Sequence, residues 1–270
     1  MNSTVTADTA RLPILLTELR LPTIKRMWES IAVQSDREGW HADRLLSTLF
    51  ELESADRHQR RLKRQRDESE LPDDKRLENF DFASLPTLSK AHVSALSEGD
   101  EWIEKGHNLL LFGPSGTGKT HLISAIAHAL LDHGWRVYFA RTGDLVQRLQ
   151  AARRDLRLPA ELAKLDRFDL LILDDFSYVR RDQAETSALF ELIAERYERK
   201  SLAITANQPF SAWDQIFPDT AMTLAAVDRL VHHATIFEMN GESFRRKTAA
   251  PGRAPERRKE KTSSQEAQPH

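Results

Sequence analysis

The stretch GPSGTGKT, residues 113–120, constrains the fold more than any other part of this 270-residue sequence. It matches the phosphate-loop pattern, in which glycines let the backbone turn tightly and aim N–H groups at phosphate oxygens. The apolar run NLLLF precedes it and KTHLISAIAHALL follows it, so a strand leads in and a helix leads out. We therefore expect a nucleotide-binding loop made of Gly113, Pro114, Ser115, Gly116, Thr117, Gly118, Lys119 and Thr120.

The last two residues of this loop have separate expected tasks. Lys119 can reach the β- and γ-phosphates of ATP, and the Thr120 hydroxyl can ligate Mg²⁺. A glycine-rich turn that binds no ligand is the alternative interpretation, and the flanking strand and helix patterns argue against it. ATP and Mg²⁺ are accordingly the expected cofactors.

Short apolar runs alternate with longer helical stretches from residue 107 onward. Strands are expected at 108–113, 136–140, 169–174, 201–206 and 234–239, and helices at 119–134, 142–156, 182–199 and 221–231. This alternation favours an α/β fold with a parallel sheet that helices cover on both faces.

The third expected strand ends on two adjacent carboxylates, Asp174 and Asp175, in the stretch FDLLILDDFSY. Its carboxyl end should lie near the phosphate loop, so Asp174 is placed to hold Mg²⁺, usually through water. Because adjacent residues of a strand point to opposite faces, Asp175 need not share that task and could orient a water near the γ-phosphate. A strand-end turn or a helix cap is the alternative for the pair.

The first part of the chain, residues 9–68, has the spacing of helices. It includes RHQRRLKRQR, residues 57–66, where six of ten residues are Lys or Arg. Arg57, Arg60, Arg61 and Arg64 share one helix face there, although a solvated face is an equally ready interpretation. We expect a helical N-terminal domain over 1–68, a connector with a helix leading into the core over 69–106, the α/β core over 107–248 and a disordered basic tail over 249–270.

Composition narrows the function classes. The chain has no cysteine, which excludes disulfides, cysteine-based zinc sites and thiol catalysis and fits the cytoplasm, where we expect the protein. No apolar run approaches the roughly 20 residues of a membrane span, and the first residues lack the pattern of a secretory signal. The formal net charge of −2 hides the local basic clusters, and such clusters can mark a nucleic-acid surface.

Two C-terminal blocks carry a more specific resemblance: ERYERKSLAITANQPFSAWDQIFPD (195–219) and AAVDRLVHHATIFEMNGESFRRK (225–247). Together with the phosphate loop, LLILDDF, LENFDFASLP (77–86) and the Arg-rich helix, they resemble the IstB family, over about residues 10–247. These are ATP-binding helper proteins of insertion sequences, related to the DnaC and DnaA group of AAA+ ATPases. The resemblance implies a small all-helical N-terminal domain and an AAA+ core with a five-stranded parallel sheet. The helical lid of that class should be reduced or absent, because the basic tail follows soon after the last strand.

The resemblance also implies an activity, namely ATP-dependent assembly on duplex DNA with ATP hydrolysis. The homo-oligomer would form through nucleotide at subunit interfaces and would recruit and stimulate a transposase partner. In this setting Lys119 and Asp174 keep the roles given above, and Asp175 stands where the wider class has a catalytic Glu. Because Asp is one methylene shorter than Glu, hydrolysis at Asp175 could be slow.

Two further residues match family positions. Asn207 matches the sensor that helps position the attacking water, and Arg229 matches a candidate arginine finger that reaches a neighbouring subunit's ATP. The alternatives are a strand-end turn for Asn207 and an ion pair within its own helix for Arg229.

Duplex DNA is expected to be held through its phosphates, largely without sequence preference. The helix QRLQAARRDLR follows the second strand, where related ATPases place nucleic-acid contacts, and surface solubility is the alternative. The candidate contacts are Arg153, Arg154 and Arg157 in this helix and Arg60, Arg61 and Arg64 in the N-terminal helix.

Two other functions compete with a transposition regulator. A DnaC-like replicative helicase loader is the nearer one, and the block at 195–219 favours the transposition regulator over it. A metabolic P-loop kinase belongs to another class, and the arginine clusters and Arg229 argue against it.

Overall fold

The computed structural model describes residues 3–176, 183–208, 213 and 220–240. Three helices open the chain: α1 (Ser3–Glu18), α2 (Pro22–Glu38) and α3 (Ala42–Ser69). They confirm the helical expectation for this part and divide it at two short breaks. Pro22 stands at the start of α2, where its missing N–H costs nothing, and Gly39 ends that helix with a left-handed φ of 64°.

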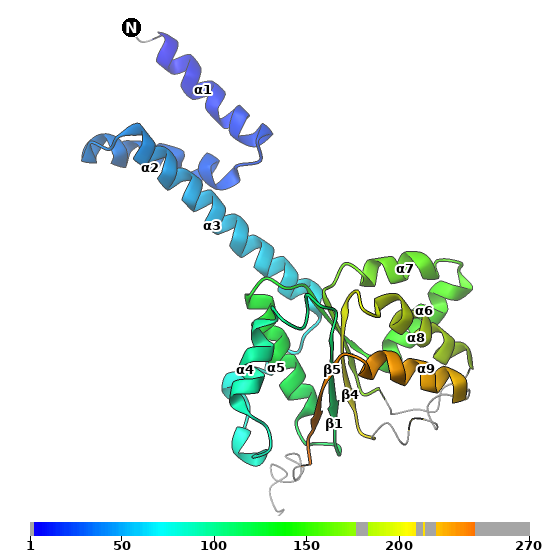
Figure 1. Cartoon of the computed structure of the whole chain (residues 1–270). Coiled ribbons are helices and arrows are strands. Elements are labelled where there is room, and N and C mark those ends of the chain that lie inside the picture. Colours follow the sequence, from blue (N-terminus) through cyan, green and yellow to red (C-terminus); the bar gives the residue numbers. More distant parts are fainter. Residues whose placement is uncertain (1–2, 177–182, 209–212, 214–219, 241–270) are drawn as a thin grey trace, which may run out of the picture.

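The N-terminal helices have a small core of their own, formed by the buried Leu16, Ile24 and Leu49. The buried carboxylate of Glu53 on α3 accepts hydrogen bonds from the backbone N–H groups of Thr23 and Ile24, at 2.8 and 3.1 Å. Negative charge is favourable at that point because the first turn of α2 leaves N–H groups unpaired. Helix α3 then runs as a long rod from these helices to the rest of the protein (Figure 1).

The connector after α3 holds two short 3-10 helices, η1 (Leu77–Asn79) and η2 (Phe82–Ser84), and the helix α4 (Lys90–Glu98). The Ser89 hydroxyl accepts a hydrogen bond from the His92 N–H and caps α4. The side chains of Leu85, Leu88 and Val93 are buried against the core. The connector is therefore packed onto the core along its length.

A parallel sheet forms the centre of the core, in the strand order β2-β3-β4-β1-β5. The strands are β1 (Asn108–Phe112), β2 (Val137–Arg141), β3 (Leu170–Asp174), β4 (Ser201–Ala206) and β5 (Ala234–Glu238). The helices are α5 (Lys119–Asp132), α6 (Thr142–Arg154), α7 (Leu158–Leu165), α8 (Gln183–Arg196) and α9 (Thr220–Val231). The expected α/β fold with a five-stranded parallel sheet is confirmed, and α7 is an additional helix that the sequence analysis missed.

Helices cover both faces of the sheet, with α4 and α5 on one side and α6, α8 and α9 on the other (Figure 1). Successive side chains of β1 point to opposite faces of the sheet, so both faces need a helical layer. Leu109 and Leu111 belong to the core cluster beneath α5, whereas Leu110 and Phe112 belong to the cluster on the opposite face. A strand buried on both faces must be apolar throughout, which accounts for the continuous apolar runs of β1 and β3.

None of the helices described is both long and apolar enough to cross a membrane. The expected reduction of the helical lid and the expected basic tail both fall within residues 241–270, outside the described residues.

Candidate nucleotide-binding site

The carboxyl ends of β1, β3 and β4 meet at a cavity of about 440 Å³. The phosphate loop forms one wall and the connector forms the other. The lining residues are Lys75, Asn79, Phe80, Asp81, Ser84, Leu85, Ser115, Gly116, Thr117, Gly118, Lys119, Thr120, His121, Asp175 and Asn207. Two regions that are far apart in the sequence therefore enclose one site.

The phosphate loop depends on its glycines. Gly116 and Gly118 have φ values of 86° and 93°, in the left-handed region that side chains other than glycine rarely adopt. Gly113 is restricted by space as well, because a Cβ there would collide with the carbonyl oxygen of Met239, the residue that follows β5. Helix α5 begins directly after Gly118, so its N-terminal end faces the cavity and favours a phosphate.

Lys119 is buried at the centre of the loop, with 5% of its surface exposed. Its ammonium donates to the carbonyl oxygens of Gly113 and Pro114 at 2.6 and 2.9 Å, and to Asn207 Oδ1 at 2.8 Å. The lysine of the motif and the expected sensor residue are therefore in direct contact. Since both also line the cavity, a γ-phosphate in this loop would lie within reach of both side chains.

Asp174 ends β3 and is 4% exposed. Its carboxylate accepts from the Thr120 hydroxyl, at 2.9 Å to Oδ1 and 3.1 Å to Oδ2, and from the Thr205 hydroxyl at 2.6 Å. Burial raises the pKa of Asp174 above its ordinary value, and the hydrogen bonds from Thr205 and Thr120 oppose that rise. A hydroxyl beside a carboxylate is the hard-oxygen donor set that Mg²⁺ prefers, so these residues fit the expected ion.

Asp175 leaves the strand in a left-handed turn, with a φ of 55°. Its backbone N–H donates to the Thr205 hydroxyl oxygen at 3.0 Å, while that hydroxyl donates to Asp174. Thr205 therefore links the two acidic residues. The exposed side chain of Asp175 lines the cavity, whereas Asp174 is buried beneath it, so the two carboxylates have different surroundings.

The connector supplies an aromatic wall that the sequence analysis missed. The ring of Phe80 meets the ring of His121 edge to face, with centroids 5.4 Å apart, and both residues line the cavity. A ring nitrogen of His121 lies 3.1 Å from the Arg76 carbonyl oxygen, which ties the start of α5 to the connector. Aromatic residues in an otherwise polar connector, as in ENFDF, are the signal that could have revealed this wall.

Arg229 lies on α9 and does not line this cavity. Its guanidinium donates to the Ala225 carbonyl oxygen at 2.8 Å and lies over the rings of Phe190 and Tyr197, 5.3 and 5.9 Å from their centroids. Among the ion pairs found between described residues, none contains Arg229. Aromatic contacts thus hold Arg229 against Phe190 of α8 and against Tyr197, which follows that helix.

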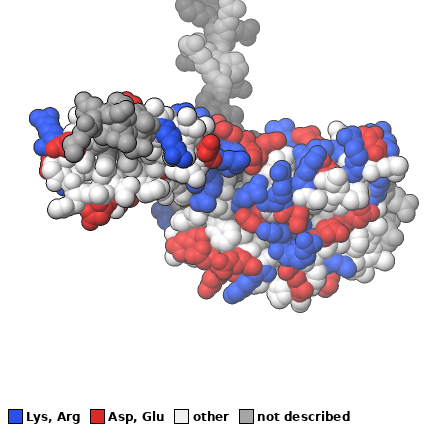
Figure 2. All heavy atoms as spheres, turned by 90° about the horizontal axis from the view of Figure 1, so that it is seen from above, with Lys and Arg blue, Asp and Glu red and all other residues white. Residues whose placement is uncertain are grey.

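The candidate DNA-contacting arginines fall into two groups. Some are engaged with acids or histidine on their own chain: Arg153 with Glu191, Arg157 with Asp155, Arg60 with Glu53 and Asp56, and Arg61 with His58. Arg154 and Arg64 are exposed. Figure 2 shows basic and acidic side chains intermixed over the core as seen from above, so no broad basic surface is visible on that face.

The parallel sheet, the phosphate loop on β1 and the acidic end of β3 define an AAA+ P-loop protein. Solved structures support this class. The structure is similar to DnaI, with a TM-score of 0.54 and 17% identity over 64% of this chain and 96% of that one. It is also similar to AMPPCP-bound DnaA from Aquifex aeolicus, with a TM-score of 0.53 and 20% identity over 64% of this chain and 52% of that one. At such identities the likeness concerns the fold alone.

The chain belongs to the IstB-like ATP-binding protein family, whose model matches residues 14–251. It is 62% identical to an insertion sequence ATP-binding protein of Sinorhizobium fredii, over 90% of this chain and 82% of that protein. It is 34% identical to the ATP-binding protein of insertion sequence IS21 from Pseudomonas aeruginosa, over 87% of this chain and 89% of that protein. The resemblance to the IstB family is confirmed.

Proposed function

We propose that this protein is an ATP-dependent regulator of transposition. It binds and hydrolyses ATP, assembles with copies of itself on duplex DNA, and recruits and stimulates the transposase of its insertion sequence. The observation that carries this proposal is the joint position of Lys119, Asn207, Thr120 and Asp174 at the phosphate loop. The relatives named as insertion sequence ATP-binding proteins support the assignment to transposition.

In this proposal the polar groups of the phosphate loop and of the strand ends have separate tasks. Backbone N–H groups of the loop and the Lys119 ammonium bind the phosphates, while Thr120 and Asp174 hold Mg²⁺. When bound, Mg²⁺ offsets the charge of the β- and γ-phosphates. Asn207 and Asp175 orient the attacking water, and the short side chain of Asp175 makes turnover slow, which suits a timer on DNA better than a motor.

Arg229 is proposed to act on the ATP of a neighbouring copy. Its place outside its own cavity, over the rings of Phe190 and Tyr197, supports a role at a subunit interface. An arginine finger stabilises charge that develops in the transition state, so hydrolysis would depend on assembly.

DNA is proposed to bind through phosphate contacts of the six candidate arginines. The exposed Arg154 and Arg64 are the first candidates, since the others must share or leave their present partners. We also retain the proposed division into an N-terminal domain (1–68), a connector (69–106), an AAA+ core (107–248) and a tail (249–270).

The central experiment compares DNA retention and ATP turnover in the parent, Lys119→Ala and Arg229→Ala proteins. Lys119→Ala is expected to lose ATP-supported assembly on DNA. Arg229→Ala is expected to bind ATP as the parent does but to lose DNA-stimulated turnover. Unchanged assembly of Lys119→Ala would show that assembly does not need the nucleotide. Normal DNA-stimulated turnover of Arg229→Ala would contradict the assignment of Arg229 as an arginine finger.

A parallel comparison of duplex with single-stranded DNA separates the regulator from a helicase loader. Stronger stimulation by duplex DNA supports the regulator. Stronger stimulation by single strands, together with binding to the replicative helicase, would favour the loader instead.

A further inference from the structure

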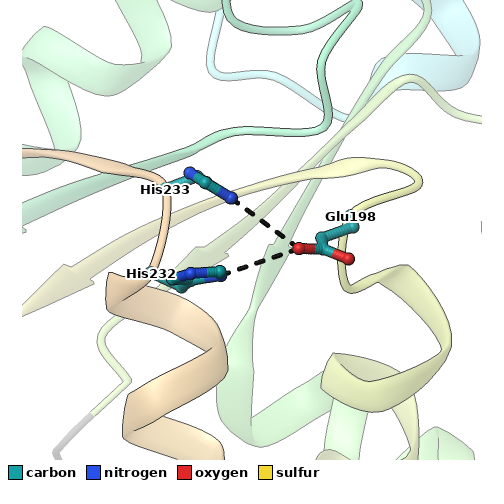
Figure 3. Close-up of side chains that lie close together, drawn as sticks. All are labelled: Glu198, His232 and His233. Atoms are coloured by element: carbon teal, nitrogen blue, oxygen red, sulfur yellow. Dashed lines mark ion pairs between the residues drawn. The ribbon is translucent and has the colours of Figure 1, made fainter.

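A cluster of two histidines and one glutamate lies at the amino ends of β4 and β5, whereas the phosphate loop follows the carboxyl end of β1. Glu198 precedes β4, while His232 and His233 link α9 to β5 (Figure 3). Glu198 Oε1 lies 3.6 Å from His232 Nδ1 and 3.7 Å from His233 Nε2, and the three side chains point toward a common centre. No part of the nucleotide site explains this convergence.

The distances suit a transition-metal ion. Zn²⁺ binds histidine nitrogen and carboxylate oxygen at about 2.0–2.2 Å, so two ligands of a tetrahedral site lie roughly 3.4 Å apart. The two separations from Glu198 exceed that value by only a few tenths of an ångström, and the ligand atoms of all three residues lie within 4.8 Å of one another. Side chains about half exposed, from 44% to 52%, can close this gap by small rotations and leave an ion open to solvent.

The backbone directs Glu198 toward the histidines. Glu198 adopts a left-handed φ of 55°, which is uncommon for a residue other than glycine. The two cations that follow it pair elsewhere, Arg199 with Asp166 and Glu195, and Lys200 with Asp169. The Glu198 carboxylate is thus paired with imidazoles although two stronger cations follow it directly in the chain.

Two neighbouring rings hold the histidines in place. His107 stacks on His233, with ring centroids 5.0 Å apart and planes 17° from parallel. The Tyr197 hydroxyl lies 2.7 Å from His232 Nδ1, within hydrogen-bonding distance. The stacking contact orients the His233 imidazole, whereas the tyrosine hydroxyl occupies the His232 nitrogen that faces Glu198 and must give way to a bound ion.

We propose that Glu198, His232 and His233 form a binding site for one divalent transition-metal ion of the Zn²⁺ class. The donor set of two nitrogens and one carboxylate is typical of such ions and poor for Mg²⁺, which prefers oxygen ligands. The bound ion joins the end of α8 to the end of α9. Helix α9 carries Arg229 one turn before His232, and the Tyr197 ring contacts both of these side chains. A bound ion therefore also restricts the motion of the end of α9 that carries Arg229.

The test is a Zn²⁺ titration of the full chain without nucleotide, in competition with a chromophoric zinc indicator, followed by thermal melting. The parent is expected to bind one Zn²⁺ per chain and to melt at a higher temperature with Zn²⁺ than without it. Glu198→Gln, His232→Ala and His233→Ala are each expected to weaken binding by about tenfold or more and to reduce the shift in Tm. His133→Ala, which removes an exposed histidine at the end of α5, is the matched control and should behave as the parent does.

Two further measurements test whether these three residues bind the ion. Co²⁺ in place of Zn²⁺ should give visible absorption bands of a low-coordinate site in the parent, and these should be lost in the His232→Ala/His233→Ala protein. Tyr197→Phe removes a group that competes for His232 Nδ1, so Zn²⁺ affinity should stay equal or increase by up to about tenfold. The proposal is overturned if the double-histidine variant binds Zn²⁺ as the parent does, if Mg²⁺ competes equally, or if Tyr197→Phe abolishes binding.

Discussion

The Lys119 ammonium donates a hydrogen bond to Asn207 Oδ1 across 88 residues of sequence, at 2.8 Å. This bond joins the first turn of α5 to the end of β4, the two elements that would lie on either side of a γ-phosphate. An amide at this position can release the lysine to a phosphate at little cost. A carboxylate there would hold it by an ion pair.

Asn207→Asp is therefore expected to weaken ATP binding by about tenfold, because the charge-assisted bond to Lys119 must be broken first. Asn207→Ala should leave affinity within about threefold of the parent while lowering turnover. Titration with a fluorescent ATP analogue measures both variants. Equal affinity of Asn207→Asp and Asn207→Ala would contradict the argument.

Asp174→Asn should stabilise the protein in the absence of nucleotide. The buried carboxylate has a raised pKa, so the folded state binds its proton more tightly than the unfolded state does. That contribution to stability is fully present below the ordinary Asp pKa of about 4 and is lost as pH rises through the raised pKa. At pH 7 the Asn variant, which has no charge to bury, should gain on the order of 1 kcal/mol, or about 2–4 °C in Tm.

Thermal melting of the parent and of Asp174→Asn from pH 7 downward tests whether the variant is the more stable protein at neutral pH. The difference in Tm should shrink on acidification and vanish below about pH 4. The same variant should lose stabilisation by Mg²⁺–ATP, so a gain in Tm without ligand and a loss with ligand are expected together. A lower Tm for Asp174→Asn at pH 7 would refute the proposed cost of burying this carboxylate.

Phe80→Ala should weaken ATP binding by about tenfold, because the ring forms the cavity wall on which a base can stack. Tripolyphosphate, which has no base, should bind the variant as it binds the parent. Phe82→Ala is the matched control, since Phe82 packs edge to face on Phe80 with centroids 4.9 Å apart but does not line the cavity. Equal losses for ATP and tripolyphosphate would show that Phe80 only supports the loop.

The sequence predicted those parts of the site that depend on local pattern. The phosphate loop is a contiguous motif between a strand and a helix, and Asp174 ends an apolar run, so both could be placed from spacing alone. Asn207 follows β4 and is assigned through family resemblance, and the structure shows that it contacts Lys119. The helix α7 was missed because it has only eight residues and follows α6 closely.

The remainder of the site depends on contacts between distant residues. Thr205 reaches Asp174 because of the register of β3 and β4, in which Leu173 lies opposite Ile204. A single threonine in an apolar strand does not indicate which residue of the neighbouring strand it contacts. Phe80 lies in the connector, and its place at the cavity depends on its packing against His121 of α5. Strand β4 and helix α9 separate Glu198 from the two histidines in the sequence, so their convergence could be found only in the fold.

Arg196→Met should lower stability by about 3–5 kcal/mol, a fall in Tm of about 10 °C. The guanidinium is 1% exposed and donates to the carbonyl oxygens of four residues, which are Leu165, Phe168, Asp169 and Ser201. Burial lowers its pKa to about 10, so it stays charged at neutral pH. The exposed Arg199→Met is the control and should cost about 0–1 kcal/mol although it breaks two ion pairs. Similar losses in urea unfolding for the two variants would contradict the role of the buried arginine.

Arg154→Ala should weaken duplex binding more than Arg153→Ala does, although the two arginines are adjacent on α6. Arg153 already donates to Glu191 at 2.6 Å and must leave that partner to reach a phosphate, whereas Arg154 is exposed. Each lost phosphate contact should reduce the slope of log K against log salt by about 0.9, so Arg154→Ala should show that reduction and Arg153→Ala only part of it. Glu191→Ala frees Arg153 and should strengthen binding. If all three variants keep the salt dependence of the parent, DNA does not contact this end of α6, and Arg64 on α3 becomes the next position to test.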